Sequence, residues 1–277
     1  MKNSKLITLT GDLGSGKSTV SKILIEELKF DYIYTGAIQR KIAERYQMST
    51  TELNVYSETH PEIDDEIDSI FKSLTNESNL IIDSRLAWFF IPNSFKIFLK
   101  TNLLIAAERI LADKIRKNEK YSSKEEAIVN IIERKASENK RYFDFYRADV
   151  TDFNNYNLIL DTSFQNPQQI ADLILKNFNL WIENKFSNKT FISPKNLFPT
   201  TENFSSDICD KINIIHFNSF DYILSGHKAV SEALIQKNEL INVNYVKDNN
   251  FYPKNKNISM YKSWENVNNF KFLWYPE

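Results

Sequence analysis

Three of the five glycines in this chain of 277 residues lie in one short string, GDLGSGKS, at positions 11–18. The string matches the phosphate-binding loop pattern G-x-x-x-x-G-K-[ST], which operates between a strand and a helix. Both neighbours fit that context. KLITLT before the loop is short and apolar, and STVSKILIEELK after it repeats apolar residues at helical spacing. The loop therefore indicates an α/β fold for the N-terminal part of the chain.

A loop of this kind holds phosphate oxygens with backbone N–H groups at a helix N-terminus. Lys17 is expected to reach the β and γ phosphates as a catalytic group, and Ser18 to offer its hydroxyl to Mg²⁺. The sequence thus predicts ATP and Mg²⁺ as cofactors. The predicted triphosphate-binding residues are Gly11, Gly14, Ser15, Gly16, Lys17, Ser18 and Thr19.

Bulk properties exclude several classes of protein. The net charge of −1 gives no basic excess of the kind that signals nucleic-acid binding. The longest apolar stretch, LAWFFI, is too short to span a bilayer, and the first ten residues lack a secretory signal. The single cysteine, Cys209, cannot form an internal disulfide, and we interpret it as a core residue. We expect a cytoplasmic protein without a membrane partner.

From residue 5 to about 179, short apolar strands alternate with amphipathic helices, which predicts a mainly parallel sheet. A proline-containing segment without helical periodicity follows, and beyond it a smaller α+β unit with a hairpin. We predict two domains, residues 1–182 and 188–277. The elements expected with most support are strands at 79–83, 96–100 and 157–163, a helix at 102–116, and a helix after Ser122 and Ser123.

Several segments together resemble the cytidylate kinase family, especially its archaeal type. They include YTGAIQRKIAERYQMSTTEL, HPEIDDEID, IIDSRLAW, KIFLK and ERI, and the long block ERKASENKRYFDFYRADVTDFNNYNLILDTS. They occur in the family's order over nearly the whole N-terminal domain. The resemblance implies a P-loop nucleoside-monophosphate-kinase-like parallel sheet flanked by helices.

The resemblance also implies an acceptor site, formed by Thr35, Gly36, Arg40, Asp83 and Arg85. The two arginines are planar forks that grip phosphate in bidentate fashion. Asp83 ends an apolar strand, where its carboxylate can face the phosphates and act among the catalytic groups. The alternatives are a helix cap for the aspartate and surface salt bridges for the arginines.

Arg134, Arg141 and Arg147 are spaced at roughly two helical turns, which places them near one side of a helix. This pattern resembles the mobile lid of nucleotide kinases, in which Arg134 and Arg141 would close over the transferring phosphoryl group as catalytic residues. A solvated helix face is the alternative. Asp149 and Asp152 are candidates for ordering the lid or binding the acceptor base.

The segment from residue 190 to about 246 resembles a ParB-like or sulfiredoxin-like α+β module. The residues that carry this resemblance are Ser225, Gly226, His227 and Lys228, with Pro199 and Thr200 upstream. The loop SGH enters a predicted helix, and a helix N-terminus is an anion site. Two interpretations stay open, a nucleotide or phosphate site and a structural or partner-binding module.

The predicted function is ATP-dependent phosphoryl transfer to a nucleoside monophosphate, CMP or dCMP first. The chain departs from the family's glutamate-glycine-arginine at Asp83 and Ser84, at Ala106, which replaces an arginine, and at Asp113, which replaces a basic residue. One alternative is therefore a kinase of a small non-nucleotide metabolite. A second is a non-catalytic, nucleotide-gated regulatory protein whose C-terminal domain binds a protein partner. Under the kinase hypotheses, phosphoryl transfer is expected to survive deletion of the chain after Ser187.

Overall fold

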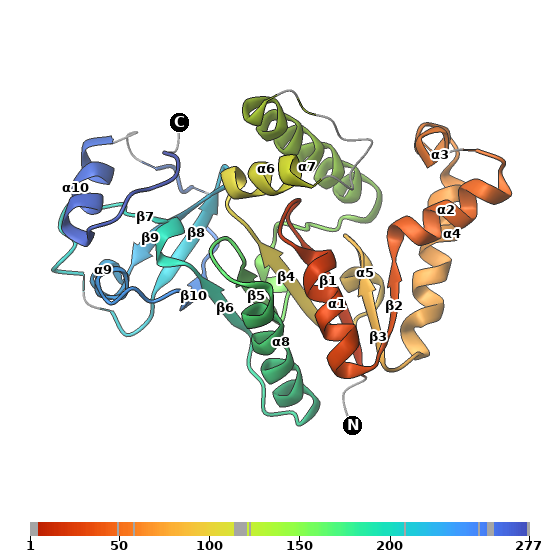
Figure 1. Ribbon diagram of the computed structural model, residues 1–277, viewed down its shortest axis with the longest axis horizontal. Helices are drawn as coiled ribbons and strands as arrows, with labels where there is room; N and C mark the ends of the chain where they lie inside the picture. Colours follow the sequence, from red (N-terminus) through yellow and green to blue (C-terminus); the bar gives the residue numbers. More distant parts are fainter. Residues whose placement is uncertain are drawn as a thin grey trace.

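The computed structural model describes residues 5–48, 50–57, 59–113, 121, 123–207, 209–248, 250–253 and 258–275. One 10-stranded sheet runs through the molecule in the order β2-β3-β1-β4-β5-β6-β10-β8-β9-β7 (Figure 1). The strands are β1 (Leu6–Gly11), β2 (Asp31–Tyr34), β3 (Leu80–Asp83), β4 (Phe95–Lys100), β5 (Leu158–Asp161), β6 (Lys189–Ile192), β7 (Leu197–Phe198), β8 (Asn213–Phe217), β9 (Phe220–Ser225) and β10 (Ile241–Tyr245).

The strands from β2 to β6 are all parallel, as predicted for the N-terminal part. Their carboxyl ends therefore meet at one edge of the sheet. Leu9 of β1 is level with Asp83 of β3, and Gly11 is level with Leu99 of β4. The loop after β1 thus lies beside the ends of the neighbouring strands, which is where parallel α/β sheets bind ligands.

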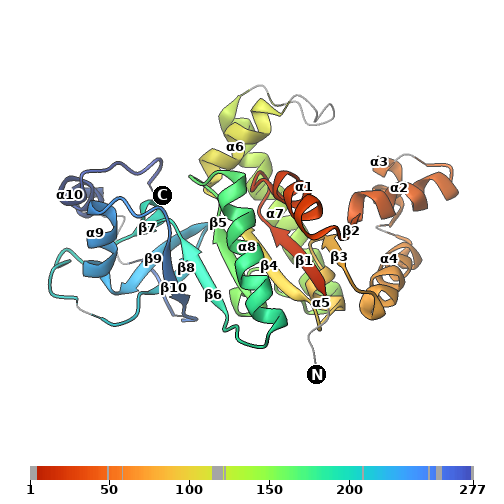
Figure 2. The same ribbon diagram turned by 60° about the horizontal axis from the view of Figure 1, so that its bottom comes forward.

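Figure 1 and Figure 2 show α1 and α8 side by side on one face of this sheet, α2 to α4 beyond its β2 edge, and α6 and α7 near the carboxyl ends of the strands. The α-helices are α1 (Lys17–Leu28), α2 (Thr35–Arg45), α3 (Thr50–Ser57), α4 (Pro61–Ser73), α5 (Ala87–Phe90), α6 (Leu103–Ala112), α7 (Lys124–Tyr146), α8 (Pro167–Ile182), α9 (His227–Ile235) and α10 (Ile258–Asn268). Short 3₁₀ turns are η1 (Leu74–Asn76), η2 (Phe153–Asn155) and η3 (Pro194–Asn196).

The central parallel strands β1, β3, β4 and β5 are buried between packed layers, and their sequences are accordingly largely apolar, whereas the edge strand β2 is partly exposed. Leu9, Ile97 and Leu160 pack against Leu24 of α1 and Ile174 of α8. The three strands predicted at 79–83, 96–100 and 157–163 are confirmed as β3, β4 and β5. The predicted helix at 102–116 is confirmed as α6, which ends earlier than expected, at Ala112, with Asp113 in an extended conformation; residues 114–116 lie outside the described part of the chain.

The helix predicted after Ser122 and Ser123 is α7. The Ser123 hydroxyl caps it by accepting a hydrogen bond from the Glu126 amide at 3.1 Å. This contact satisfies one of the amides that a helix start leaves unpaired. Ser122 itself lies outside the described residues.

The proline-containing segment that we predicted to separate two domains contains a strand. β6 pairs in parallel with β5 and in antiparallel fashion with β10. Phe191 and Ile192 suit a strand that covers the otherwise open edge of β5. The sheet therefore runs without a break from the first half of the chain into the second.

One apolar core also joins the two halves. Phe98 and Ile159 of the parallel sheet belong to the same buried cluster as Ile214, Tyr222 and Trp264 from the C-terminal region. The division into residues 1–182 and 188–277 stays a prediction, and any two such domains share a sheet and a core.

Two local predictions for the C-terminal region had different outcomes. The predicted hairpin is confirmed as β8 and β9, joined at Asn218 and Ser219, whose φ angles of 46° and 70° suit a tight hairpin turn. The interpretation of Cys209 as a core residue is wrong: its side chain is exposed, with Sγ 3.6 Å from an Asp207 carboxylate oxygen. Among the described residues, no helix is both long and apolar enough to cross a membrane.

Candidate functional site

The loop between β1 and α1 has the geometry of a phosphate cradle. Gly16 is the N-cap residue of α1, and the first amides of an α-helix have no partner within the helix. The Thr19 amide is already engaged, because it donates to the Gly16 carbonyl oxygen at 3.0 Å. The Lys17 ammonium donates hydrogen bonds to the carbonyl oxygens of Gly11 at 3.2 Å and Asp12 at 3.4 Å. It is therefore held over the loop before any ligand arrives.

The charge state of Lys17 is set by its surroundings. Burial and the neighbouring Arg85 guanidinium lower the pKa of Lys17 to about 8, against the opposing effect of Asp83 and Asp12. A triphosphate would add negative charge at this ammonium and favour its protonated form.

Asp83 lies at the carboxyl end of β3, beside the loop. Its carboxylate accepts a hydrogen bond from the Tyr32 hydroxyl at 3.2 Å, and its backbone carbonyl accepts one from Thr35 Oγ1 at 3.4 Å. The N-cap residues of the nearby helices α2 and α5 are Tyr34 and Leu86. The structure therefore places Asp83 at the strand end and not at a helix cap.

Arg85 connects the phosphate loop with α7. Its guanidinium donates a hydrogen bond to the carbonyl oxygen of Gly11, and its Nε lies 3.1 Å from Oε2 of Glu138. The other Glu138 oxygen binds Arg134 Nε at 2.9 Å. A single carboxylate of α7 thus holds two arginines in place, and the Arg85 side chain is only 22 % exposed, unlike that of a surface ion pair.

A cavity of about 680 Å³ lies between α2, α4, α5 and α7. Of the predicted acceptor residues, it brings together Thr35, Gly36 and Arg85. Arg40 is not among the lining residues; its guanidinium lies over the Tyr34 ring, 5.1 Å from the ring centroid. The cavity is lined by Thr35, Gly36, Gln39, Ile67, Asp68, Phe71, Ser84, Arg85, Leu86, Phe90, Arg134, Ser137, Glu138, Arg141, Tyr142, Phe145 and Tyr146.

The predicted arginine face of α7 is present for two of its three members. Arg134 and Arg141 both line the cavity. Arg147 follows the end of the helix with a φ of 55°, and its guanidinium lies over the Phe143 ring, 5.4 Å from the centroid. Because the helix ends at Tyr146, the helical periodicity does not extend to Arg147.

The acidic candidates Asp149 and Asp152 do not line the cavity. Asp149 accepts hydrogen bonds from the amide and hydroxyl of Thr151, and Asp152 pairs with Lys247 at 2.6 Å. Sequence analysis missed two carboxylates of the cavity wall, Glu138 and Asp68. Asp68 of α4 is 7 % exposed and accepts a hydrogen bond from the Tyr146 hydroxyl at 3.2 Å. Its only sequence signal is its place in HPEIDDEID.

Arg109 of α6 was also missed as an individual residue, although it lies in the quoted segment ERI. Its guanidinium donates hydrogen bonds to the carbonyl oxygens of Gly14 at 3.2 Å, Thr162 at 2.7 Å and Ser163 at 3.2 Å. It therefore ties the phosphate loop to the segment that follows β5. The Asp161 carboxylate organises that segment by accepting hydrogen bonds from the amide of Ser163 at 2.9 Å and the side-chain amide of Asn196 at 2.7 Å.

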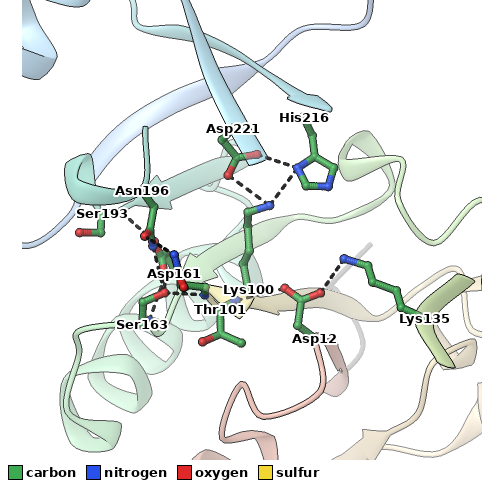
Figure 3. Close-up of polar contacts among 11 residues, drawn as sticks. Asp12, Lys100, Thr101, Lys135, Asp161, Ser163, Ser193, Asn196, His216 and Asp221 are labelled. Atoms are coloured by element: carbon green, nitrogen blue, oxygen red, sulfur yellow. Dashed lines mark hydrogen bonds and ion pairs between the residues drawn. The ribbon is translucent and has the colours of Figure 1, made fainter. Parts of the chain in front are cut away.

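A second cavity, of about 250 Å³, adjoins the loop on its other side. Asp12 lies in its wall and accepts hydrogen bonds from the Thr101 amide at 3.1 Å and the Lys135 ammonium at 3.0 Å (Figure 3). Burial acts to raise the pKa of Asp12, but Lys135 and Lys100 outweigh it and hold the pKa at about 2. Arg85 lines both cavities, so the two adjoin at this arginine.

The C-terminal loop Ser225 to Lys228 has a different arrangement. The His227 side chain is buried, its Nε2 accepts a hydrogen bond from the Thr200 amide at 3.0 Å, and its Nδ1 lies 2.5 Å from Oδ2 of Asp207. The same Asp207 oxygen accepts a hydrogen bond from the His227 backbone amide at 2.9 Å. An aspartate of the chain thus occupies the helix N-terminus that we predicted as an anion site.

The remaining members of this loop are also engaged within the chain. Ser225 Oγ lies 2.9 Å from the Asn213 side-chain amide, and Lys228 pairs with Glu232 at 4.0 Å on the surface of α9. Burial lowers the pKa of His227, against the opposing effect of Asp207. Because Nε2 accepts a hydrogen bond from the Thr200 amide, the imidazole is neutral, and both of its ring nitrogens are bonded within the chain.

The oxygen donors near the phosphate loop are the groups that could hold a metal ion. Within the described ranges, no group of three or more His, Cys, Asp and Glu side chains is positioned to hold a metal ion. The Ser18 hydroxyl, in the first turn of α1, and the Asp83 carboxylate, at the end of β3, are hard oxygen donors. They fit the few protein ligands that Mg²⁺ takes when phosphates and water complete its shell.

Comparison with known proteins agrees with this geometry. The model of the cytidylate kinase-like family matches residues 6–164. A cytidylate kinase of Pyrococcus horikoshii is 36 % identical over 174 residues, which cover 62 % of this chain and 88 % of that protein. An S-adenosylmethionine-dependent nucleotide dehydratase of Lacinutrix mariniflava is 35 % identical over 210 residues, or 68 % of this chain and 43 % of that protein.

Among solved structures, an uncharacterized protein from Eubacterium ventriosum superposes with a TM-score of 0.50 at 14 % identity, covering 63 % of this chain and 98 % of that one. That likeness concerns the fold alone. The family match ends at residue 164, so the likeness of the C-terminal region to ParB-like modules stays a prediction. The family match over more than half of the chain shows that this chain belongs to the cytidylate kinase-like family.

Proposed function

We propose that this protein transfers the γ-phosphoryl group of ATP to a nucleoside monophosphate, with CMP or dCMP as the first candidates. The observation that carries the proposal is the cavity of about 680 Å³ beside the phosphate loop, into which Arg85, Arg134 and Arg141 converge. An acceptor monophosphate brings nearly two negative charges next to a triphosphate, so fixed cations are needed between them. The three arginines of the cavity meet this need, which supports the cavity as the acceptor site.

On the donor side, the loop amides and Lys17 bind the phosphates of ATP. The Lys17 ammonium already lies within 3.4 Å of the Gly11 and Asp12 carbonyl oxygens and need move little to reach the β and γ phosphates. Ser18 and Asp83 would hold Mg²⁺, which neutralises charge on the phosphate oxygens when bound. Arg109, bonded to the Gly14 carbonyl, keeps the loop in register with the segment after β5.

On the acceptor side, Arg85 and Arg134 are aligned by Glu138 before any substrate is bound. This alignment reduces the entropy that the arginines lose when they grip a phosphate. Arg141 lies further along the same face of α7 and adds a third cation to the cavity. No general base is required because the acceptor phosphate is already anionic. Positioning and electrostatic stabilisation account for the catalysis.

The acceptor cavity also contains a group able to select a base. The Asp68 carboxylate, largely buried beside Tyr146, accepts hydrogen bonds and suits an exocyclic amino group such as that of cytosine. Uracil presents a carbonyl oxygen at the same position and would be repelled. We assign Asp68 the role of distinguishing cytosine from uracil in the proposed reaction.

The direct test is a coupled assay for ADP formation with a panel of monophosphates and a pool of small phosphorylated and hydroxylated metabolites. We expect turnover with CMP or dCMP well above that with the other nucleotides. ADP release with the metabolite pool alone would favour a metabolite kinase. ATP binding without turnover on any acceptor would contradict the proposal and favour a nucleotide-gated regulatory protein.

Asp68→Asn tests the assignment of the base. An asparagine can donate to the uracil carbonyl as well as accept, so the preference for CMP over UMP in kcat/KM should fall by about ten- to a hundredfold. Ser69→Ala, at the next position of α4, is the matched control because the Ser69 hydroxyl only donates to the Glu66 carbonyl on the exposed side. An unchanged ratio in D68N, with activity retained, would refute the assignment.

A further inference from the structure

The hairpin of the C-terminal region reaches the edge of the sheet that carries the phosphate loop. Lys100 is the last residue of β4, and its ammonium lies 3.1 Å from Oδ2 of Asp221 on β9 (Figure 3). The two side chains are 10 % and 3 % exposed, so the pair is almost fully buried. A buried cation requires such a partner because desolvation of an unpaired charge is very unfavourable.

His216 on β8 completes this contact. Its Nδ1 lies 2.8 Å from the other Asp221 oxygen and 3.3 Å from the Lys100 ammonium. Since an ionised carboxylate only accepts hydrogen bonds, Nδ1 carries the proton. Burial and the nearby Lys100 lower the pKa of His216, against the opposing effect of Asp221. A neutral imidazole therefore fixes the carboxylate, and the carboxylate fixes the lysine.

Lys100 precedes Thr101, whose backbone amide binds Asp12 of the phosphate loop. The Thr101 amide donates to Asp12, and Asp12 lies between β4 and Lys135 of α7. The cavity of about 250 Å³ is lined by Lys100 and His216 as well as by Asp12 and Lys135. Lys100 therefore has room to turn from Asp221 towards Asp12. Figure 3 shows the two carboxylates on either side of this lysine.

We propose that Asp221, fixed by His216, is a positioning residue of the phosphoryl-transfer site, because it holds the Lys100 ammonium away from Asp12. This inference rests on the proposed kinase function. It makes the C-terminal region part of the active centre and not an attached module. The contact acts on the phosphate loop through Lys100, and neither Asp221 nor His216 touches the substrate.

Removal of the Asp221 charge would leave the Lys100 ammonium buried without its counter-ion. Asp12 is the acidic side chain that shares the cavity wall with it, so Lys100 would turn towards Asp12 and compete with Thr101 and Lys135 for its oxygens. The phosphate loop begins at Asp12, so its amides and Lys17 would shift. Displacements of this kind lower kcat strongly because phosphoryl transfer depends on positioning.

The same contacts make truncation a poor test of the C-terminal region. Deletion after Ser187 removes β6 from the edge of β5 and removes Ser193 and Asn196, which donate to the buried Asp161 carboxylate. It also removes the partner of Lys100. We expect that truncated chain to lose stability for these reasons, so single substitutions in the full chain are needed.

The experiment compares wild type, Asp221→Asn, Lys100→Met and the double variant, with Glu265→Gln as control. Glu265 is also buried and ion-paired, with Lys271 at 3.1 Å, but its contacts lie within α10 and the segment after it. We expect kcat of D221N to fall by about tenfold and kcat of the double variant to return to within about threefold of wild type, because the methionine removes the misplaced charge. E265Q should lower the Tm while leaving kcat unchanged.

The outcomes separate this inference from the proposed function. A wild-type kcat in D221N, or no recovery in the double variant when D221N is impaired, would overturn the inference while the kinase function stands. If the wild type transfers phosphate to no acceptor, the proposed function fails, and Mg·ATP binding by calorimetry decides the inference instead. In that case D221N should bind Mg·ATP several-fold more weakly and the double variant should recover; equal affinity in wild type and D221N would overturn it.

Discussion

Two loops of this protein share the same local design. In each, a glycine with a left-handed conformation precedes a helix: Gly16 before α1, with a φ of 79°, and Gly226 before α9, with a φ of 90°. A basic or ionisable side chain follows directly in both, Lys17 in the first and His227 in the second. By sequence each is a candidate anion site.

The two loops differ in what the rest of the chain places in front of them. A Cβ atom on Gly16 would meet nothing within 4 Å, whereas one on Gly226 would lie 3.1 Å from the Cα of Ile212. The α9 N-terminus is already occupied by the Asp207 carboxylate. The lesson is that a glycine before a helix marks an exchangeable anion site only where the chain supplies no anion of its own.

The largest effect is expected from the pair Lys17→Ala and Lys228→Ala. The first removes the ammonium that binds the phosphates, so phosphoryl transfer should fall by about a thousandfold or more. The second removes an exposed lysine whose partner is Glu232, and should leave kcat and Tm within error. Steady-state kinetics and thermal melting check both. A large loss of activity in K228A would show that the second loop takes part in the reaction.

Asp207→Ala tests whether the second loop is held by its own carboxylate. The substitution removes the partner of both the His227 amide and the His227 ring, so the free energy of unfolding should fall by about 1 to 3 kcal/mol. Urea denaturation measures this free energy. The control is Glu232→Ala on α9, the helix that begins at His227. If D207A unfolds at the same urea concentration as E232A, Asp207 does not hold the loop.

The next largest effect is expected in the pH dependence of ATP binding at the first loop, which contains Lys17. The pKa of Lys17 is about 8 in the free protein, and bound phosphates raise it, so ATP binding above that pH requires proton uptake. The ATP affinity should be about tenfold weaker at pH 9 than at pH 7, with proton uptake visible by calorimetry in buffers of different ionisation enthalpy. Lys17→Arg should remove this dependence. A flat affinity from pH 7 to 9 would contradict the prediction.

The smallest effects are expected from alanine at the two helix-capping glycines. Both positions require a positive φ, which costs an alanine about 1 kcal/mol. Gly226→Ala also crowds Ile212, so it should be the less stable of the two variants. Gly16→Ala should instead weaken ATP binding, because its Cβ would lie where the phosphates approach. Equal stability and equal ATP affinity in the two variants would remove the distinction between the loops.

Much of the N-terminal fold follows from the sequence because its signals are local. The apolar strands β3, β4 and β5 and the cap at Ser123 are set by residues next to one another in the chain. The phosphate loop is local in the same sense, since all of its groups lie between Gly11 and Thr19. Arg85, Arg134 and Arg141 were found by family order, and the structure brings them to one cavity.

The residues that sequence analysis missed depend on long-range contacts. Asp68 meets Tyr146 because α4 packs beside the end of α7, and Arg109 of α6 meets Thr162 in the segment after β5. Arg40 was predicted at the acceptor site, and in the structure its guanidinium lies over the Tyr34 ring. The spacing of residues along the sequence does not predict how such side chains are buried or oriented.

The sequence by itself determined that a phosphate loop lies between a strand and a helix, because glycine, lysine and apolar periodicity act over a few residues. Only the tertiary structure decided that β6 joins both halves in one sheet, that Asp207 fills the second loop, and that Asp221 pairs with Lys100 across 121 positions of the chain, from 100 to 221. Pairing of distant charges and strand edges depends on burial, and burial is settled only when the whole chain has packed.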